Sequence, residues 1–212
     1  MLNIIIAGLG GQGTILVSRL IGEAAVTAGF DVRGSETIGM AQRGGSVISH
    51  LRIHKPSPGS ASGAGRASGA GSEIYSPLIP PFNADMVIAF EAGEAIRAAD
   101  FLKPGGSLVV CNRIIKPVTG GESYTKEPLF AWLSANVKQL FAADGEELSA
   151  QCGERFLNTA LAGFAMQTRL FPFSADDMEA VIRKKIKPQF VEQNIHALQT
   201  GYTHKPPPGV LL

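Results

Sequence analysis

A glycine-rich turn close to the start of the chain is the feature that most constrains the fold. The stretch IAGLGGQGTI at 6–15 follows an apolar run at 2–7 that predicts a buried strand, and it precedes a helical pattern. Strand, glycine turn and helix in this order form the setting of a dinucleotide-binding turn. The turn holds the spacing G-x-G-x-x-G in Gly8, Gly10 and Gly13, with Gly11 and Gln12 at the two positions between the last two glycines. Two interpretations stay open here: the glycines cradle a ligand, or they only permit a tight, closely packed turn.

The segments after the turn predict a mixed sheet. Apolar residues recur at three- and four-residue spacing between Thr14 and Ala28, which predicts a helix lying on a sheet. Strands are expected at 30–35 and 47–53, with only about eleven residues between them. A parallel crossover needs a dozen or more residues and usually a helix. We therefore expect these two strands to pair antiparallel.

Alternation of strands and helices returns later in the chain. We expect a strand at 84–91, a helix at 91–101, a turn at 104–106 and a strand at 107–111. Beyond residue 126 helical patterns dominate, with a short strand at 137–142 as an alternative. The predicted fold class is therefore α/β: a three-layer, Rossmann-like, mixed but mostly parallel sheet with helices on both faces and a helical C-terminal part. The segment at 155–166 is apolar nearly all round, so it is buried on several sides or covered by a partner.

Length and composition predict one domain over 1–212, interrupted by a flexible loop at 58–72. That loop reads PGSASGAGRASGAGS, a composition that buries too little apolar area to offset its ordering entropy. Neither a leader peptide nor a membrane span is expected, so we expect a cytoplasmic location.

Charge and cysteine content narrow the classes of partner. A net charge of +1 gives no electrostatic reason to expect nucleic acid or a membrane surface. Charged residues make up 17% of the chain, below the usual proportion of about 25%, which favours a surface partly covered by another subunit. Cys111 and Cys152 form no metal-binding motif, so no metal site is expected in this chain.

Ligand chemistry is indicated more clearly than catalysis. Thr14 occupies the position where a P-loop needs Lys, so nucleotide hydrolysis is not expected. Glu36 lies near the place of a ribose-binding acid, which leaves a nicotinamide or flavin site as an alternative. Arg43, Gly44 and Gly45 combine a planar cation with unshielded backbone N–H groups, which suits phosphate or carboxylate, although the glycines could equally form only a turn. Catalytic residues stay unassigned.

The whole pattern resembles the gamma-type subunits of 2-oxoacid:ferredoxin oxidoreductases, and within that family the beta subunits of indolepyruvate ferredoxin oxidoreductases. The resemblance rests on GLGGQGTILVSRLIGEAA, GMAQRGGSVISHLRI, YSPLIP and EAIRAADFLKPGGSLVV, in this order. The pairing of G-x-G-G-Q-G with M-A-Q-R-G-G about thirty residues later is more specific than either half. The likeness covers most of residues 1–115. The loop at 58–72 departs from the family pattern.

The resemblance implies oxidative decarboxylation of a 2-oxoacid such as indolepyruvate or pyruvate, with coenzyme A taking the acyl group and ferredoxin the electrons. Thiamine diphosphate and iron–sulfur clusters would then be carried by a large partner subunit, and contacts between two copies of this chain stay open. The candidate coenzyme A cradle comprises Gly8, Gly10, Gly11, Gln12, Gly13, Arg43, Gly44 and Gly45. The alternative is a stand-alone protein that binds NAD or FAD.

Overall fold

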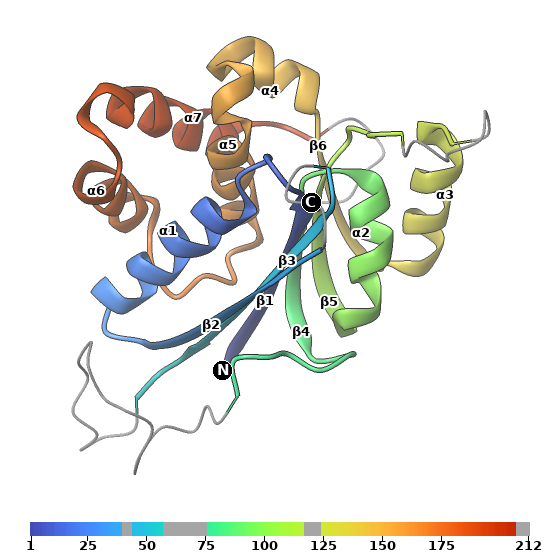
Figure 1. Cartoon of the computed structure of the whole chain (residues 1–212), viewed down its shortest axis with the longest axis horizontal. Helices are drawn as coiled ribbons and strands as arrows, with labels where there is room; N and C mark the ends of the chain where they lie inside the picture. The colour runs from blue at the N-terminus through green and yellow to red at the C-terminus, as the bar shows by residue number, and fades with distance from the viewer. Residues whose placement is uncertain (40–43, 57–75, 117–123, 207–212) are drawn as a thin grey trace.

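One mixed sheet runs through the computed structural model, which describes residues 1–39, 44–56, 76–116 and 124–206. Its strand order is β2–β3–β1–β4–β5–β6 (Figure 1). Neighbours among β1, β4, β5 and β6 run parallel, whereas β3 is antiparallel to both β1 and β2. The predicted antiparallel pairing of the second and third strands is therefore confirmed. The strands are β1 (Leu2–Leu9), β2 (Asp31–Ile38), β3 (Ser46–His54), β4 (Ala84–Ala89), β5 (Leu102–Cys111) and β6 (Gln139–Ala143).

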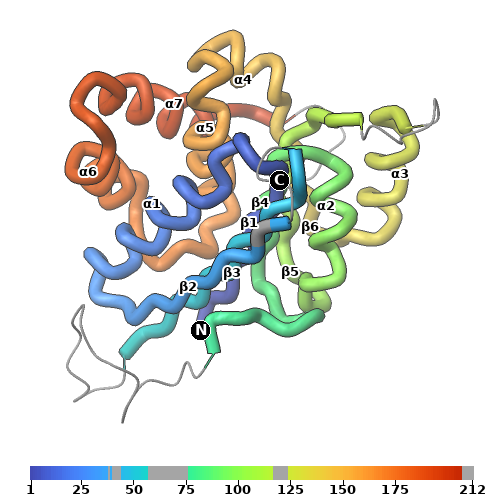
Figure 2. The backbone as a smooth tube through the Cα atoms, viewed as in Figure 1, coloured from blue at the N-terminus to red at the C-terminus, as the bar shows by residue number. Residues whose placement is uncertain are grey.

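Helices cover both faces of the sheet, as Figure 2 shows, so the predicted three layers are confirmed. Ile4 and Ile6 pack into the cluster that contains α1 and the C-terminal helices, whereas Ile5 and Ala7 pack against α2 and α3. Burial on both faces explains why β1 is a continuous apolar run. The helices are α1 (Thr14–Thr27), α2 (Ala92–Ala98), α3 (Lys126–Asn136), α4 (Gly145–Cys152), α5 (Leu157–Ala165), α6 (Ala175–Lys185) and α7 (Val191–Thr203).

The apolar segment expected at 155–166 is covered by its own chain. Gly163 and Gly201 bring α5 and α7 into close contact: a Cβ at Gly163 would lie 2.1 Å from the Leu198 carbonyl oxygen. At Gly201 it would lie 1.8 Å from the carbonyl oxygen of Ala160. Each residue of α5 except the half-buried Asn158 is buried. Burial within the chain thus accounts for the pattern without a partner.

The start of β5 differs from the sequence-based expectation. The turn expected at 104–106 lies inside β5, which begins at Leu102. A register shift between Ala84 and Met86 in the β4–β5 pairing absorbs the extra residues, as in a β-bulge. The expected loop at 58–72 lies outside the described residues. Within the described parts of the chain, no helix has the length and apolar character needed to cross a membrane.

Candidate functional site

The carboxyl ends of β1 and β4 mark a switch point in the fold. The two strands are parallel neighbours, yet α1 follows β1 onto one face of the sheet and α2 follows β4 onto the other (Figure 1). Open α/β sheets bind ligands in the crevice that such a divergence leaves. The glycine turn lies at this place.

Backbone geometry explains why the turn is made of glycine. Gly11 and Gly13 have φ angles of 105° and 85°, which side-chain-bearing residues rarely adopt. A Cβ at Gly13 would lie 2.1 Å from Asn158 Nδ2, whereas a Cβ at Gly11 would meet no atom within 4 Å. Gly13 therefore serves packing as well as the turn, and Gly11 faces open space. Packing thus accounts for Gly13, whereas the ligand interpretation stays open for Gly11.

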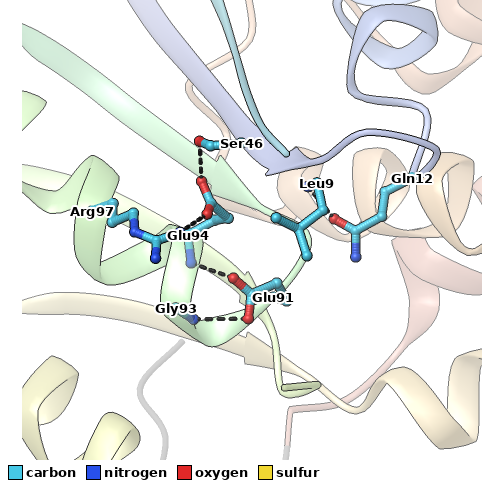
Figure 3. Close-up of polar contacts among 7 residues, drawn as sticks. All are labelled: Leu9, Gln12, Ser46, Glu91, Gly93, Glu94 and Arg97. Atoms are coloured by element: carbon cyan, nitrogen blue, oxygen red, sulfur yellow. Dashed lines mark hydrogen bonds and ion pairs between the residues drawn. The ribbon is translucent and has the colours of Figure 1, made fainter. Parts of the chain in front are cut away.

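Gln12 closes the turn internally. The side-chain Oε1 of Gln12 accepts a hydrogen bond from the Leu9 backbone N–H at 2.7 Å, and the Gln12 backbone N–H donates to the Leu9 carbonyl oxygen at 3.0 Å. A Cβ on Gly8 would lie 2.8 Å from that same Oε1. The side chain of Gln12 also lines the cavity described below, where its amide nitrogen points away from Leu9 (Figure 3).

The second glycine segment lies directly beside the first. The Gly10 N–H donates to the Gly45 carbonyl oxygen at 2.8 Å, and the Gly44 N–H donates to the Gly10 carbonyl oxygen at 3.3 Å. The first two strands run in the same direction but are not neighbours, because β3 lies between them. It is the turn into β3 that reaches the glycine turn. Arg43 lies outside the described residues.

A cavity of about 900 Å³ opens on this edge of the sheet. It takes its walls from the turns after four parallel strands and from the start of α5. Its lining includes Gly11 and Gln12 after β1, Phe90 after β4, Asn112 and Arg113 after β5, and Asp144 after β6. Gly44 and Gly45 are not among the lining residues. The cavity therefore extends from the glycine turn toward β6, away from β3.

Two helices that begin at this edge differ in how their first N–H groups are satisfied. Asp144 caps α4: its Oδ1 accepts from the N–H groups of Glu146 and Glu147, both at 3.0 Å. The bond from Glu147 is the main cause that lowers the pKa of the Asp144 carboxyl. α1 begins at Gly13 with no side-chain cap and no acid in its first turn. Its N-terminal donors and the positive end of its dipole remain available to an anion.

Cationic side chains line the same cavity, and two of them are held in place. Arg113 donates to Glu154 at 2.5 Å and to Ser149 Oγ at 2.9 Å. The Arg155 guanidinium lies 4.1 Å from the ring centre of Phe190, within cation–π range. These contacts fix the direction of each guanidinium. Three acids line the same cavity: Asp144, Glu146 and Glu154. Glu154 balances the charge of Arg113, so of these two cations Arg155 is better suited to recognise an anionic group.

Sequence reasoning missed most of this cavity. Asn112 and Arg113 were detectable, because they are polar and directly follow the predicted strand at 107–111. Ligands of open α/β sheets bind at the carboxyl ends of the strands. Arg155 and Asn158 gave no signal, because they precede or belong to a helix that reads as core. Only the folded chain brings them to the glycine turn.

Other candidate residues from the sequence do not line the cavity. Glu36 lies within the edge strand β2, with β3 between it and β1, so the geometry of a ribose-binding acid is absent and the dinucleotide interpretation is not favoured. Both cysteines are buried free thiols, and burial raises the pKa of Cys111 to about 11. No group of three or more His, Cys, Asp or Glu side chains that could hold a metal occurs in the described ranges.

Comparison with known proteins agrees with this architecture. The sequence model of the family described as pyruvate ferredoxin/flavodoxin oxidoreductase matches residues 3–204. A relative from Pyrococcus horikoshii, indolepyruvate oxidoreductase subunit IorB, is 34% identical over 205 residues, covering 94% of this chain and 93% of its own. The subunit of the same name from Archaeoglobus fulgidus is 34% identical over 207 residues, covering 95% and 94%.

Solved structures share the fold. The gamma subunit of a keto/oxoacid ferredoxin oxidoreductase from Geobacter sulfurreducens superposes with a TM-score of 0.68 at 21% identity, covering 95% of this chain and 96% of that one. A 2-oxoglutarate:ferredoxin oxidoreductase from Magnetococcus marinus, solved with 2-oxoglutarate, coenzyme A and succinyl-CoA, gives a TM-score of 0.65 at 20% identity. It covers 99% of this chain and 33% of that longer chain.

Proposed function

Because this chain belongs to the pyruvate ferredoxin/flavodoxin oxidoreductase family, we propose that its complex catalyses the coenzyme A-dependent oxidative decarboxylation of indolepyruvate or a related 2-oxoacid. The chain is a subunit of a multi-subunit 2-oxoacid oxidoreductase, which implies larger catalytic partner subunits. The names of its relatives support an aromatic 2-oxoacid as substrate.

We assign thiamine diphosphate and the iron–sulfur clusters to a large partner subunit, with ferredoxin receiving the electrons from that complex. Cys111 and Cys152 are buried thiols, and the described residues supply no cluster of metal-ligating side chains. When bound by the partner, these groups would supply carbanion stabilisation and electron transfer. This chain would contribute a surface for the acyl acceptor. A cytoplasmic location is part of the same proposal.

The acyl acceptor is coenzyme A, and its phosphates bind at the glycine turn. The observation that carries this assignment is the uncapped start of α1, which follows directly on Gly11 and Gln12, two residues that line the cavity of about 900 Å³. Phosphate oxygens would accept hydrogen bonds from the first N–H groups of α1 and gain from its dipole. The proposed cradle comprises Gly8, Gly10, Gly11, Gln12 and Gly13, together with Arg43, Gly44 and Gly45. Gly11 and Gln12 line the cavity, whereas Gly44 and Gly45 do not line it and contact the glycine turn through Gly10.

Replacement of Arg43 tests the assignment in the assembled enzyme. Arg43→Ala should weaken the apparent affinity for coenzyme A by about 1.5–3 kcal/mol, the usual range for a hydrogen bond to a charged group, and leave assembly intact. The matched control is Arg183→Ala, because that guanidinium forms exposed ion pairs with Glu179 and Glu192 on the far helices. An affinity for coenzyme A that stays unchanged in Arg43→Ala would return the glycines to a structural role.

A further inference from the structure

A buried carboxylate links the second glycine segment to α2. Glu94 has no exposed side-chain surface, and its Oε2 accepts a hydrogen bond from the Ser46 hydroxyl at 2.5 Å (Figure 3). Its other carboxylate oxygen pairs with Arg97, whose side chain is 59% exposed. Ser46 is the first residue of β3 and directly follows Gly44 and Gly45. The contact therefore reaches from α2 to the segment that flanks the glycine turn.

Glu94 is itself held by a second buried acid. Glu91, the N-cap of α2, accepts hydrogen bonds from the N–H groups of Gly93 and Glu94. The Ile115 backbone also donates to Glu91, and the Ala92 N–H donates to the Arg113 carbonyl oxygen at 2.9 Å. These hydrogen bonds hold the first turn of α2 against the cavity wall at Arg113 and Ile115. The Ser46–Glu94 hydrogen bond then connects α2 to β3.

Burial of a carboxylate is costly, and a buried ion pair is weak evidence of a contribution to stability. The arrangement is better explained if Glu94 orients the neighbouring Gly44–Gly45 segment than if it stabilises the fold. Among the described residues, backbone hydrogen bonds with Gly10 join Gly44 and Gly45 to the glycine turn. Ser46, the next residue, is held by the Glu94 carboxylate and by the Gly39 N–H, which donates to the Ser46 carbonyl oxygen at 3.0 Å. The Leu9–Ser46 pair is the last in the β1–β3 ladder, so the hydroxyl acts where regular pairing ends.

We propose that Glu94 is a positioning residue, which acts through Ser46 to hold the Gly44–Gly45 segment against Gly10 and so fixes the glycine turn, whose Gly11 and Gln12 line the cavity proposed for the anionic cofactor. This inference rests on the proposed function for its effect on coenzyme A. Its structural part, the immobilisation of Gly44 and Gly10 by the Ser46–Glu94 hydrogen bond, is independent of the ligand.

Serine substitutions separate positioning from general stability. Ser46→Ala removes the hydroxyl, and Ser46→Thr keeps one. Ser107→Ala is the matched control, because the Ser107 hydroxyl donates to Gln139 Oε1 at 2.8 Å at the start of β6, distant from the glycine turn. In the assembled complex, Ser46→Ala should raise the KM for coenzyme A by on the order of fivefold to tenfold, as expected for loss of a charge-assisted hydrogen bond. The KM for the 2-oxoacid and kcat at saturating coenzyme A should not change.

Amide hydrogen exchange in the full chain gives the second readout. Ser46→Ala should accelerate exchange at Gly10 and Gly44 and leave the interior of α1 unchanged, whereas Ser46→Thr and Ser107→Ala should exchange as the parent chain does at these two glycines. Unchanged exchange at Gly10 and Gly44 in Ser46→Ala would overturn the positioning role. So would an equal rise of both KM values, which indicates a general structural defect. If exchange accelerates but neither Ser46→Ala nor Arg43→Ala alters the KM for coenzyme A, the positioning stands and the proposed cofactor assignment fails.

Discussion

α1 and α4 begin at the same edge of one sheet, yet their N-termini are built differently. α4 starts at Asp144, whose carboxylate occupies its first N–H groups, and two acids follow in its first turn. α1 starts at a glycine and carries no acid there. A capped helix supplies its own anion, whereas an uncapped one leaves that place to a ligand. The difference supports the proposal that the glycine side of the cavity receives the negative charge of a ligand, whereas the β6 side carries its own.

The largest expected effect separates the two kinds of glycine within the turn. Gly13→Ala should lower the free energy of unfolding by about 2–5 kcal/mol, because backbone strain adds to a clash with Asn158. Gly11→Ala should cost only the strain, about 1–3 kcal/mol, because its Cβ would point into open space. Chemical denaturation of both variants measures the difference. Equal losses would contradict the separate roles given to these glycines.

A smaller effect concerns two helix caps at this edge, whose carboxyls are shifted in opposite directions. Burial raises the pKa of Glu91, so its contribution to stability is full below the ordinary glutamate pKa of about 4.3 and is lost as the pH rises through the folded value. The hydrogen bond from Glu147 lowers the pKa of Asp144, so its contribution is present above the ordinary aspartate pKa of about 3.9. That contribution is lost as the pH falls through the folded value.

Unfolding measured between about pH 3 and pH 7 tests these signs. Asp144→Asn should reduce the loss of stability on acidification relative to the parent chain. Glu91→Gln should become more favourable relative to the parent as the pH rises. Curves that shift in the same direction in both variants would contradict the assignment of one carboxyl as a solvated cap and the other as a buried one.

The smallest expected effect is the absence of a reaction. Burial raises the pKa of the Cys111 thiol to about 11 and that of Cys152 in the same direction, so both thiols are protonated near neutral pH. Alkylation of the folded chain by iodoacetamide at about pH 7.5 should leave both cysteines unmodified, and the denatured chain should react at both cysteines. Rapid labelling of the folded chain would show that the β6 side of the site is open rather than structural.

Local pattern was enough to predict the layers and the glycine turn but not the complete site. The apolar run at 2–7, the antiparallel hairpin at 30–53 and the capping box that Ser174 forms with Asp177 all depend on residues close in sequence. The Thr159 hydroxyl donates to Asn194 Oδ1 at 2.7 Å, a contact between α5 and α7 that only the folded chain brings together. The cavity wall at Arg155 and Asn158 depends on how α5 crosses the sheet edge, which no local pattern encodes. That residues 1–212 form one domain stays a prediction.

Gln12→Glu tests most directly the claim that the uncapped side receives the phosphates of coenzyme A. The carboxylate can still accept the Leu9 N–H, so the fold should be retained, but the cavity gains a negative charge beside the start of α1. Like charges about 6–8 Å apart repel by about 2–3 kcal/mol at an effective dielectric constant of about 20. The assembled variant should therefore bind coenzyme A at least about tenfold more weakly, with Gln193→Glu on the exposed side of α7 as the unaffected control. An affinity for coenzyme A equal to that of the parent enzyme, in a variant that assembles normally, would contradict the account.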